Sequence, residues 1–147
     1  MEVLRGRFGY IFEGKNGYPA TCNSNIIEAH TPLNIKGINV LPFEQLHGKI
    51  TSFGYRFGKF AYSTDVSELS DFAFKMLEGV EVWLVDALRY EPHPTHSHLE
   101  RTLSWIDRVK PKQAFLTHMT WDLDYETLCK DLPDHIRPAF DGMEINL

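Results

Sequence analysis

Short runs of β-branched and aromatic residues between turn signals dominate the first 64 residues of the chain. The runs lie at residues 8–12, 25–30, 33–43, 51–57 and 60–64, and Lys36-Gly37 interrupts the third. Gly58-Lys59 separates the last two runs by a tight turn, for which glycine can supply a positive φ. We therefore predict antiparallel strands and hairpins over this part of the chain.

The pattern changes to alternating helices and strands beyond residue 66. Ser67 can cap a helix that carries Leu69, Phe72 and Met76 on one face, and Gly79 can end that helix. A buried strand is then predicted over the mainly apolar residues 81–88.

A second helix is predicted from a capping signal at Ser97 and Glu100, which have the spacing of a capping box. Apolar residues recur at helical spacing from Leu99 to Val109, and Pro111 ends the run. A strand over 113–117, a helix over 125–132 and a short strand follow. Strands followed by this alternation indicate a layered α/β fold. We expect its core to include Leu84, Val85, Leu103, Ile106, Phe115 and Leu116.

The composition is that of one globular domain or part of one. Of the 147 residues, 43% are hydrophobic and 24% are charged, and no repeat or linker divides residues 1–147. The net charge of −5 and the lack of a Lys/Arg run argue against binding to duplex nucleic acid or an anionic membrane. No apolar stretch approaches the roughly 20 residues of a membrane span, and the start lacks a signal-peptide core, so we expect a cytoplasmic protein.

Two candidate metal ligands, Asp65 and His118, come directly after predicted strands. Ligands of open α/β sheets gather at the carboxyl ends of strands, which favours such a role. A histidine that caps the strand end is equally consistent with His118, and a carboxylate near a helix N-terminus is the simpler explanation of Asp65. His47 shifts this balance, because a turn at Gly58-Lys59 pairs Asp65 near Ser52 and brings His47 to the same end of the sheet.

His47, Asp65 and His118 offer the nitrogen and oxygen ligands that zinc or manganese accepts, and a carboxylate can bridge two ions. Three ligands do not fill two coordination spheres, so the chain is expected to lack part of a two-metal site.

The loop at residues 93–98 (His-Pro-Thr-His-Ser-His) precedes the second predicted helix. One of its histidines can act as a general acid or base, whereas an exposed histidine-rich turn is the simpler interpretation. Asp86, near the end of the preceding strand, is expected to be solvated or to cap an element.

The chain resembles the metallo-β-lactamase superfamily, and within it the branch of the phosphoribosyl cyclic phosphodiesterase of phosphonate breakdown. The resemblance extends over nearly the whole chain. It is carried by residues 7–12, 47–48, 52–56, 62–65, 93–96, 116–119 and 140–145. It implies the C-terminal half of an αββα sandwich, in which His47 and His118 each ligate one metal and Asp65 bridges both. It further implies that His96 is the general acid for the leaving oxygen.

Two departures from the family pattern affect the expected activity. The His-x-His-x-Asp-His motif of the family's N-terminal half, which supplies most ligands of both metals, is absent from residues 1–147. Trp121 stands where some members have a histidine of a separate structural zinc site, so that zinc is not expected. A complete site would hold two Zn²⁺ or Mn²⁺ ions, and we expect fewer or none in this chain.

The function expected from the resemblance is metal-dependent hydrolysis of a small phosphodiester, such as a cyclic phosphate or a nucleotide-like molecule. Because half of the site is missing, we expect the isolated chain to be weak or inactive as an enzyme. The alternatives are an inactive remnant that folds on a partner and a mononuclear metal-binding module that uses His47, Asp65 and His118 alone. The expected macromolecular partner is a missing N-terminal half or a second copy of the chain.

Overall fold

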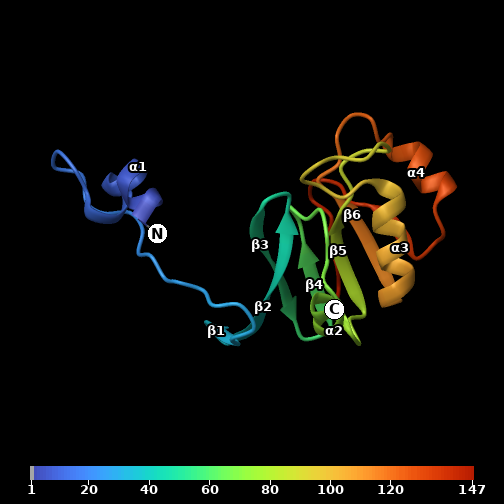
Figure 1. Ribbon diagram of the computed structural model, residues 1–147, viewed down its shortest axis with the longest axis horizontal. Helices are drawn as coiled ribbons and strands as arrows, with labels where there is room; N and C mark the ends of the chain where they lie inside the picture. Colours follow the sequence, from blue (N-terminus) through green and yellow to red (C-terminus); the bar gives the residue numbers. More distant parts are fainter. Residues whose placement is uncertain (1) are drawn as a thin grey trace.

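A seven-stranded sheet forms the centre of the molecule in the computed structural model, which describes residues 2–147. The strands lie in sequence order, so that each one pairs with the next (Figure 1). They are β1 (Leu33–Ile35), β2 (Ile38–His47), β3 (Ile50–Phe57), β4 (Phe60–Ser63), β5 (Val82–Asp86), β6 (Gln113–Thr117) and β7 (Ile136–Pro138). The pairings from β1 to β4 are antiparallel, and those from β4 to β7 are parallel.

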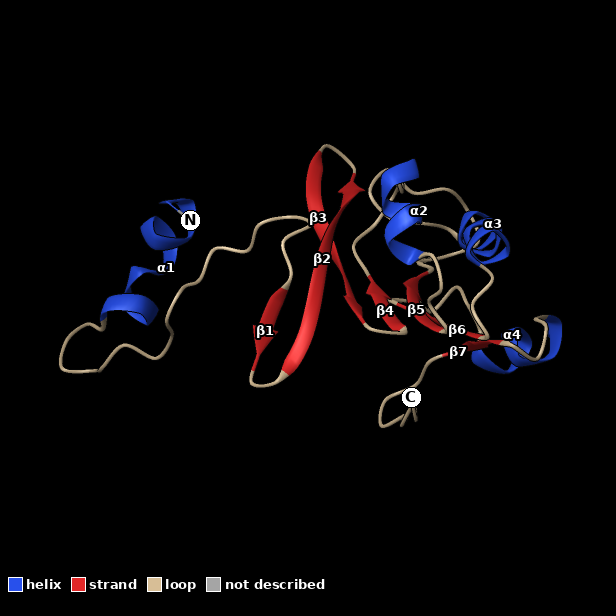
Figure 2. Cartoon of the chain, turned by 90° about the horizontal axis from the view of Figure 1, so that it is seen from below, coloured by secondary structure: helices blue, strands red, loops and turns tan. Residues whose placement is uncertain are grey.

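Helices connect the parallel strands. They are α2 (Asp71–Leu77), α3 (Leu99–Val109) and α4 (Tyr125–Asp131), and a further helix, α1 (Glu2–Glu13), precedes the sheet. Figure 2 shows α2 and α3 on the same face of the sheet. In the described part of the chain, no helix is both long enough and apolar enough to cross a membrane.

The core fills the space between this face of the sheet and the two helices. Trp83 on β5 and Leu116 on β6 are fully buried against Leu77 of α2 and Ile106 of α3. The indole nitrogen of Trp83 donates a hydrogen bond to the Ser63 hydroxyl at 3.1 Å, so the large ring is buried without leaving its polar atom unpaired. The layered α/β architecture predicted from the sequence is confirmed.

Most of the predicted strands and core residues are confirmed. The break at Lys36-Gly37 separates β1 from β2, and Gly58-Lys59 forms the turn between β3 and β4. Four of the six expected core residues are buried. The exceptions, Leu84 and Leu103, are half-buried, because Leu84 lies on the sheet face opposite α2 and α3, and Leu103 packs at the rim of the core.

Two predicted strands near the N-terminus are wrong. Residues 8–12 belong to α1, which is kinked at Phe8, and residues 25–30 form no strand. A strand needs a neighbour for its backbone hydrogen bonds, whereas a helix satisfies them internally. Helix α1 buries no residue and lies apart from the sheet (Figure 1). Without a partner strand there, local helical bonding prevails.

The helix caps also differ from the prediction. Ser70, not Ser67, caps α2 by accepting a hydrogen bond from the Ala73 amide at 3.1 Å. The buried side of α2 consequently carries Ala73, Phe74 and Leu77, and Phe72 is exposed. At α3 the cap residue is His98, without a side-chain bond. The Ser97 hydroxyl instead bonds the Thr102 hydroxyl at 2.7 Å within the core.

We predict that Gly54→Ala destabilises the fold. A Cβ at Gly54 would lie 2.5 Å from the Phe43 ring carbon Cε2, and Phe43 is fully buried and cannot move aside. Overpacking of this kind costs about 1–3 kcal/mol, which urea unfolding can measure. Gly6→Ala is the matched control, because a Cβ at Gly6 meets nothing within 4 Å. Equal stability of the two variants would contradict the prediction.

Candidate metal centre

Three histidine rings surround the carboxylate of Asp65. Its Oδ1 atom lies 3.9 Å from Nε2 of His47, 4.0 Å from Nε2 of His96 and 3.9 Å from Nε2 of His118. His47 ends β2, Asp65 follows β4, His96 lies in the loop between β5 and α3, and His118 follows β6. The four residues named from the sequence as metal ligands or acid therefore meet at one end of the sheet.

The hairpin register places Asp65 at this end. Strands β3 and β4 pair Phe57 with Phe60 across the turn, and continuing that register brings Asp65 opposite Ser52. The Ser52 hydroxyl donates to the Asp65 carbonyl at 2.7 Å. The Gln45 side-chain amide donates to the Thr64 carbonyl at 2.6 Å, so both residues of the turn after β4 are held from the neighbouring strands. The predicted approach of Asp65 to Ser52 is confirmed.

Asp65 and His118 both adopt a left-handed backbone conformation, with φ of 54° and 63°. A residue with a Cβ pays roughly 1–2 kcal/mol for this conformation, which glycine adopts freely. Each residue lies within two positions of the end of a strand, and its side chain is part of the cluster. Non-glycine residues held in such conformations concentrate at functional sites, which supports a ligand role for both.

The imidazole of His47 is oriented by a backbone carbonyl. Its Nδ1 atom lies 2.7 Å from the Thr95 carbonyl oxygen, so Nδ1–H donates and Nε2 keeps its lone pair on the side of Asp65. Gly48 permits this approach, because its φ is +63° and an added Cβ would lie 2.7 Å from the Thr95 methyl carbon.

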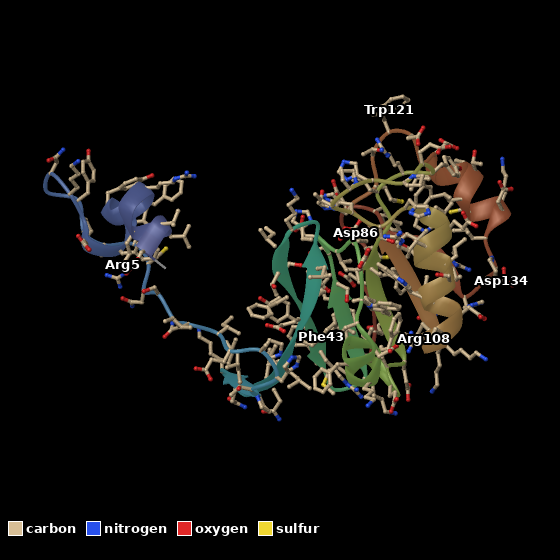
Figure 3. The ribbon with its side chains drawn as sticks, viewed as in Figure 1. Arg5, Phe43, Asp86, Arg108, Trp121 and Asp134 are labelled. Atoms are coloured by element: carbon tan, nitrogen blue, oxygen red, sulfur yellow. The ribbon has the colours of Figure 1, made fainter. Side chains whose placement is uncertain are left out.

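His96 is oriented by a buried carboxylate. Asp86, at the end of β5 inside the body of the fold (Figure 3), has no exposed surface, and its Oδ2 lies 2.9 Å from His96 Nδ1. The same oxygen accepts a hydrogen bond from the Val66 amide at 3.2 Å. Burial raises the pKa of the Asp86 carboxyl, and the hydrogen bonds from His96 and Val66 oppose that rise.

The expectation that Asp86 is solvated or capping was wrong. Its signal was in the sequence, because Asp86 follows Val82–Val85 just as His118 follows a buried apolar run, and strand ends were already the place to seek ligands. The loop histidines differ among themselves. His93 packs its ring 5.3 Å from the His96 ring without joining Asp65, and His98 starts α3.

The donor atoms fit a divalent metal ion. One nitrogen of His47, one of His96 and a carboxylate oxygen of Asp65 all lie within 4.8 Å of one another. The rings of His96 and His118 stack at 4.8 Å, so His96 lies beside both predicted histidine ligands. Imidazole nitrogen with carboxylate oxygen is the set that zinc and manganese accept. The assignment of His47, Asp65 and His118 as ligands and His96 as the acid stays a prediction.

The chain is similar to several known proteins over most of its length. The model of the β-lactamase superfamily domain matches residues 1–119. A solved diphosphatase of the PhnP family is 35% identical, with a TM-score of 0.86 over 97% of this chain and 52% of that one. The metallo-β-lactamase fold protein YhfI from Bacillus subtilis is 14% identical, with a TM-score of 0.73 over 94% of this chain and 59% of that one, and shows the same fold.

A curated relative is the octanoyltransferase of Porphyromonas gingivalis, which is 26% identical over 148 residues. The match covers 98% of this chain and 30% of that protein. The chain thus spans about half the length of the matched structures and less than a third of this relative.

We predict opposite pH dependences for two aspartate variants. Because burial raises the pKa of Asp86 above 3.8 in the folded state, ionisation of this carboxyl costs stability as the pH rises through that window. The free energy of unfolding of the wild type, relative to Asp86→Asn, should therefore fall as the pH rises from about 4 through the raised pKa of Asp86. Urea unfolding with a chelator present measures it.

Asp124→Asn is the control of opposite sign. Hydrogen bonds from the Thr127 hydroxyl and amide lower the pKa of Asp124, so its ionised form favours the folded state. The wild type should gain stability relative to this variant as the pH rises to about 4, and should keep that gain at higher pH, where its stability relative to Asp86→Asn falls. A gain relative to Asp86→Asn as well would mean that the His96 hydrogen bond outweighs the burial of the carboxylate.

Proposed function

This chain belongs to the β-lactamase superfamily, and we propose that it forms the C-terminal half of a dinuclear metal-dependent hydrolase of small phosphodiesters. The observation that carries the proposal is the convergence of three imidazole Nε2 atoms within 4.0 Å of one carboxylate oxygen. The 35% identity to a diphosphatase of the PhnP family supports phosphorus–oxygen bond cleavage. Acyl transfer is not part of the proposal, because the match with this chain covers only 30% of the octanoyltransferase.

Three residues would hold the metals. His47 and His118 each present an Nε2 atom on the side of Asp65, and the Asp65 carboxylate, about half exposed, has a second oxygen with which to bridge two ions. We expect zinc or manganese from this nitrogen and oxygen donor set. When bound, such ions supply a Lewis acid and lower the pKa of water.

His96 would protonate the departing oxygen. Its Nδ1–H is committed to Asp86, so its Nε2, which is on the Asp65 side, is the atom from which a proton can be given. The buried Asp86 carboxylate would stabilise the imidazolium before transfer and hold the ring in place afterwards. Asp86 is thus a positioning residue in this scheme.

The chain provides only part of a two-metal site. Residues 2–147 bring three imidazoles and one carboxylate to the cluster, whereas two ions need more ligands than these, especially when one histidine is the acid. The missing ligands correspond to the His-x-His-x-Asp-His motif that the sequence lacks. We therefore propose that a second segment completes the site.

A second candidate function is a mononuclear metal-binding module. It is favoured by the mutual proximity of His47, Asp65 and His96, whose donor atoms all lie within 4.8 Å. In that case His96 would be a ligand and not an acid. Metal stoichiometry and the effect of removing His96 on metal affinity separate the two functions. The absence of any bound metal would favour an inactive remnant.

We predict that the chain alone binds a divalent ion more weakly than a full-length relative does, because water must fill the missing coordination positions. Asp65→Asn, which tolerates the left-handed backbone, should weaken zinc binding by at least about tenfold in a calorimetric titration. Asp134→Asn is the control, since Asp134 is an exposed carboxylate remote from the cluster (Figure 3). Tight binding of two ions per chain would show that no essential ligand is missing.

We predict that phosphodiester hydrolysis by the chain alone is near background. Supplying the N-terminal half by co-expression or fusion should restore turnover of bis-p-nitrophenyl phosphate. The rescue should fail with Asp65→Ala, because the bridging carboxylate is lost. Full activity of the unaided chain would overturn the half-site proposal.

We predict that in the rescued protein His96→Ala leaves metal bound and lowers the rate by about 10²–10⁴ on an alkyl cyclic phosphate. The loss should be smaller on the nitrophenyl ester, because nitrophenolate leaves with little protonation. Comparing kcat/KM for both substrates tests the role. Equal losses would remove His96 from the role of acid, and loss of metal would make it a ligand.

A further inference from the structure

Trp121 projects into solvent at the end of the molecule that carries the histidine cluster (Figure 3). Its side chain is 94% exposed, whereas the other two tryptophans, Trp83 and Trp105, are 0% and 8% exposed. Exposing a whole indole to water forgoes the burial that usually stabilises this residue, and it leaves a flat aromatic surface free to stack on a ring.

Hydrogen bonds hold the loop on both sides of Trp121. On one side of it, the Thr120 amide and hydroxyl both donate to the Leu88 carbonyl, at 2.9 and 3.0 Å. On the other side, the Asp122 carboxylate accepts a hydrogen bond from the Tyr90 amide at 3.3 Å. The backbone is fixed before and after the indole, so the ring is presented outward by the fold.

A cavity of about 380 Å³ lies beside Trp121. Its volume is in the range of small-molecule sites. His93 lines it, and the His93 ring is 5.3 Å from the ring of His96. A molecule with its phosphorus at Asp65 can therefore extend past His93 into this cavity.

The other walls suit a flat group that donates hydrogen bonds. The Arg89 guanidinium is locked by its bonds to the Glu91 and Pro92 carbonyls, at 3.0 and 2.7 Å, and presents a planar surface of the kind that stacks on rings. The carboxylates of Glu91 and Asp122 also line the cavity. They accept hydrogen bonds from amino groups and repel a phosphate.

We propose that this cavity is a nucleobase subsite in which Trp121 stacks on the base, so that the substrate is a phosphodiester of a nucleotide. The proposal rests on the proposed function, because the nucleotide's phosphate would lie at the His47, Asp65 and His118 cluster. The proposed subsite restricts the substrate class from any small phosphodiester to a phosphodiester whose aromatic base fits the cavity between His93 and Trp121.

The test compares two ligands that share a phosphate and differ in the base. AMP and ribose 5-phosphate are titrated into the zinc-loaded chain, and tryptophan fluorescence and calorimetry report binding. The wild type should prefer AMP by between about fivefold and about a hundredfold, the usual effect of stacking one base on an aromatic side chain. AMP should quench the emission of exposed Trp121, while the emission of buried Trp83 and Trp105 stays unchanged.

Matched variants isolate the stacking. Trp121→Ala should abolish the preference for AMP without changing the affinity for ribose 5-phosphate, and Trp121→Phe should keep most of it. Tyr18→Ala removes an aromatic ring that is 80% exposed far from the cavity, and should change neither affinity. A preference that survives Trp121→Ala overturns the proposal.

Failure of the subsite is distinguishable from failure of the phosphodiesterase assignment. Equal affinity for both ligands in the wild type, or no binding of AMP to a rescued protein that hydrolyses bis-p-nitrophenyl phosphate, removes the subsite. The rescued hydrolysis of bis-p-nitrophenyl phosphate stands or falls independently of this result. Shielding of Trp121 from acrylamide in the rescued protein without AMP would make it a contact between protein segments and would also overturn the proposal.

Discussion

The position of one carboxylate governs the arrangement of the candidate site. Asp65 has a left-handed backbone conformation just after β4. The Nε2 atoms of His47, His96 and His118 all lie within 4.0 Å of its Oδ1 atom. The hairpin register sets this position, since a slip by one residue would turn the side chains of β4 to the other face of the sheet. The turn at Gly58-Lys59 thus controls, from the far end of the strands, where the carboxylate lies.

The histidines are arranged by groups that do not themselves face the cluster. The Thr95 carbonyl fixes His47, and the Asp86 carboxylate fixes His96, in each case through Nδ1. Both imidazoles therefore turn Nε2 toward Asp65. The same loop takes part in both hydrogen bonds, because Thr95 and His96 are neighbours in the chain. Burial raises the pKa of the Asp86 carboxyl, because a charged group is less stable in the core than in water. A strand end with only a structural role would not need a carboxyl group there.

The sequence was informative where the chemistry is local or periodic. Turn glycines and apolar runs located β3 to β6, and with them the strand ends that Asp65 and His118 follow. The predicted strand that ends at residue 43 is four residues short of the observed end of β2 at His47. It was misleading where tertiary context decides. Residues 8–12 have strand-forming side chains but no neighbouring strand, and Ser97 sits in a capping pattern yet bonds Thr102 in the core. The partnership of Asp86 with His96 depends on how a loop folds back, which no spacing rule describes.

The face of the sheet opposite α2 and α3 supports the half-site proposal, independently of the number of metal ligands that the chain supplies. Parallel strands are normally covered on both faces, but α2 and α3 cover only one face here (Figure 2). On the other face, the register aligns Tyr62 with Leu84 and Leu84 with Phe115. The segment carrying Phe140 and Met143 covers part of this apolar row, lining a cavity with Leu84, while Tyr62 stays exposed. A second sheet packed on this face would complete an αββα sandwich and would approach the same strand ends at which the ions proposed at Asp65 would need further ligands. Under the half-site proposal, one further layer would both complete the metal coordination and cover the exposed part of this apolar row.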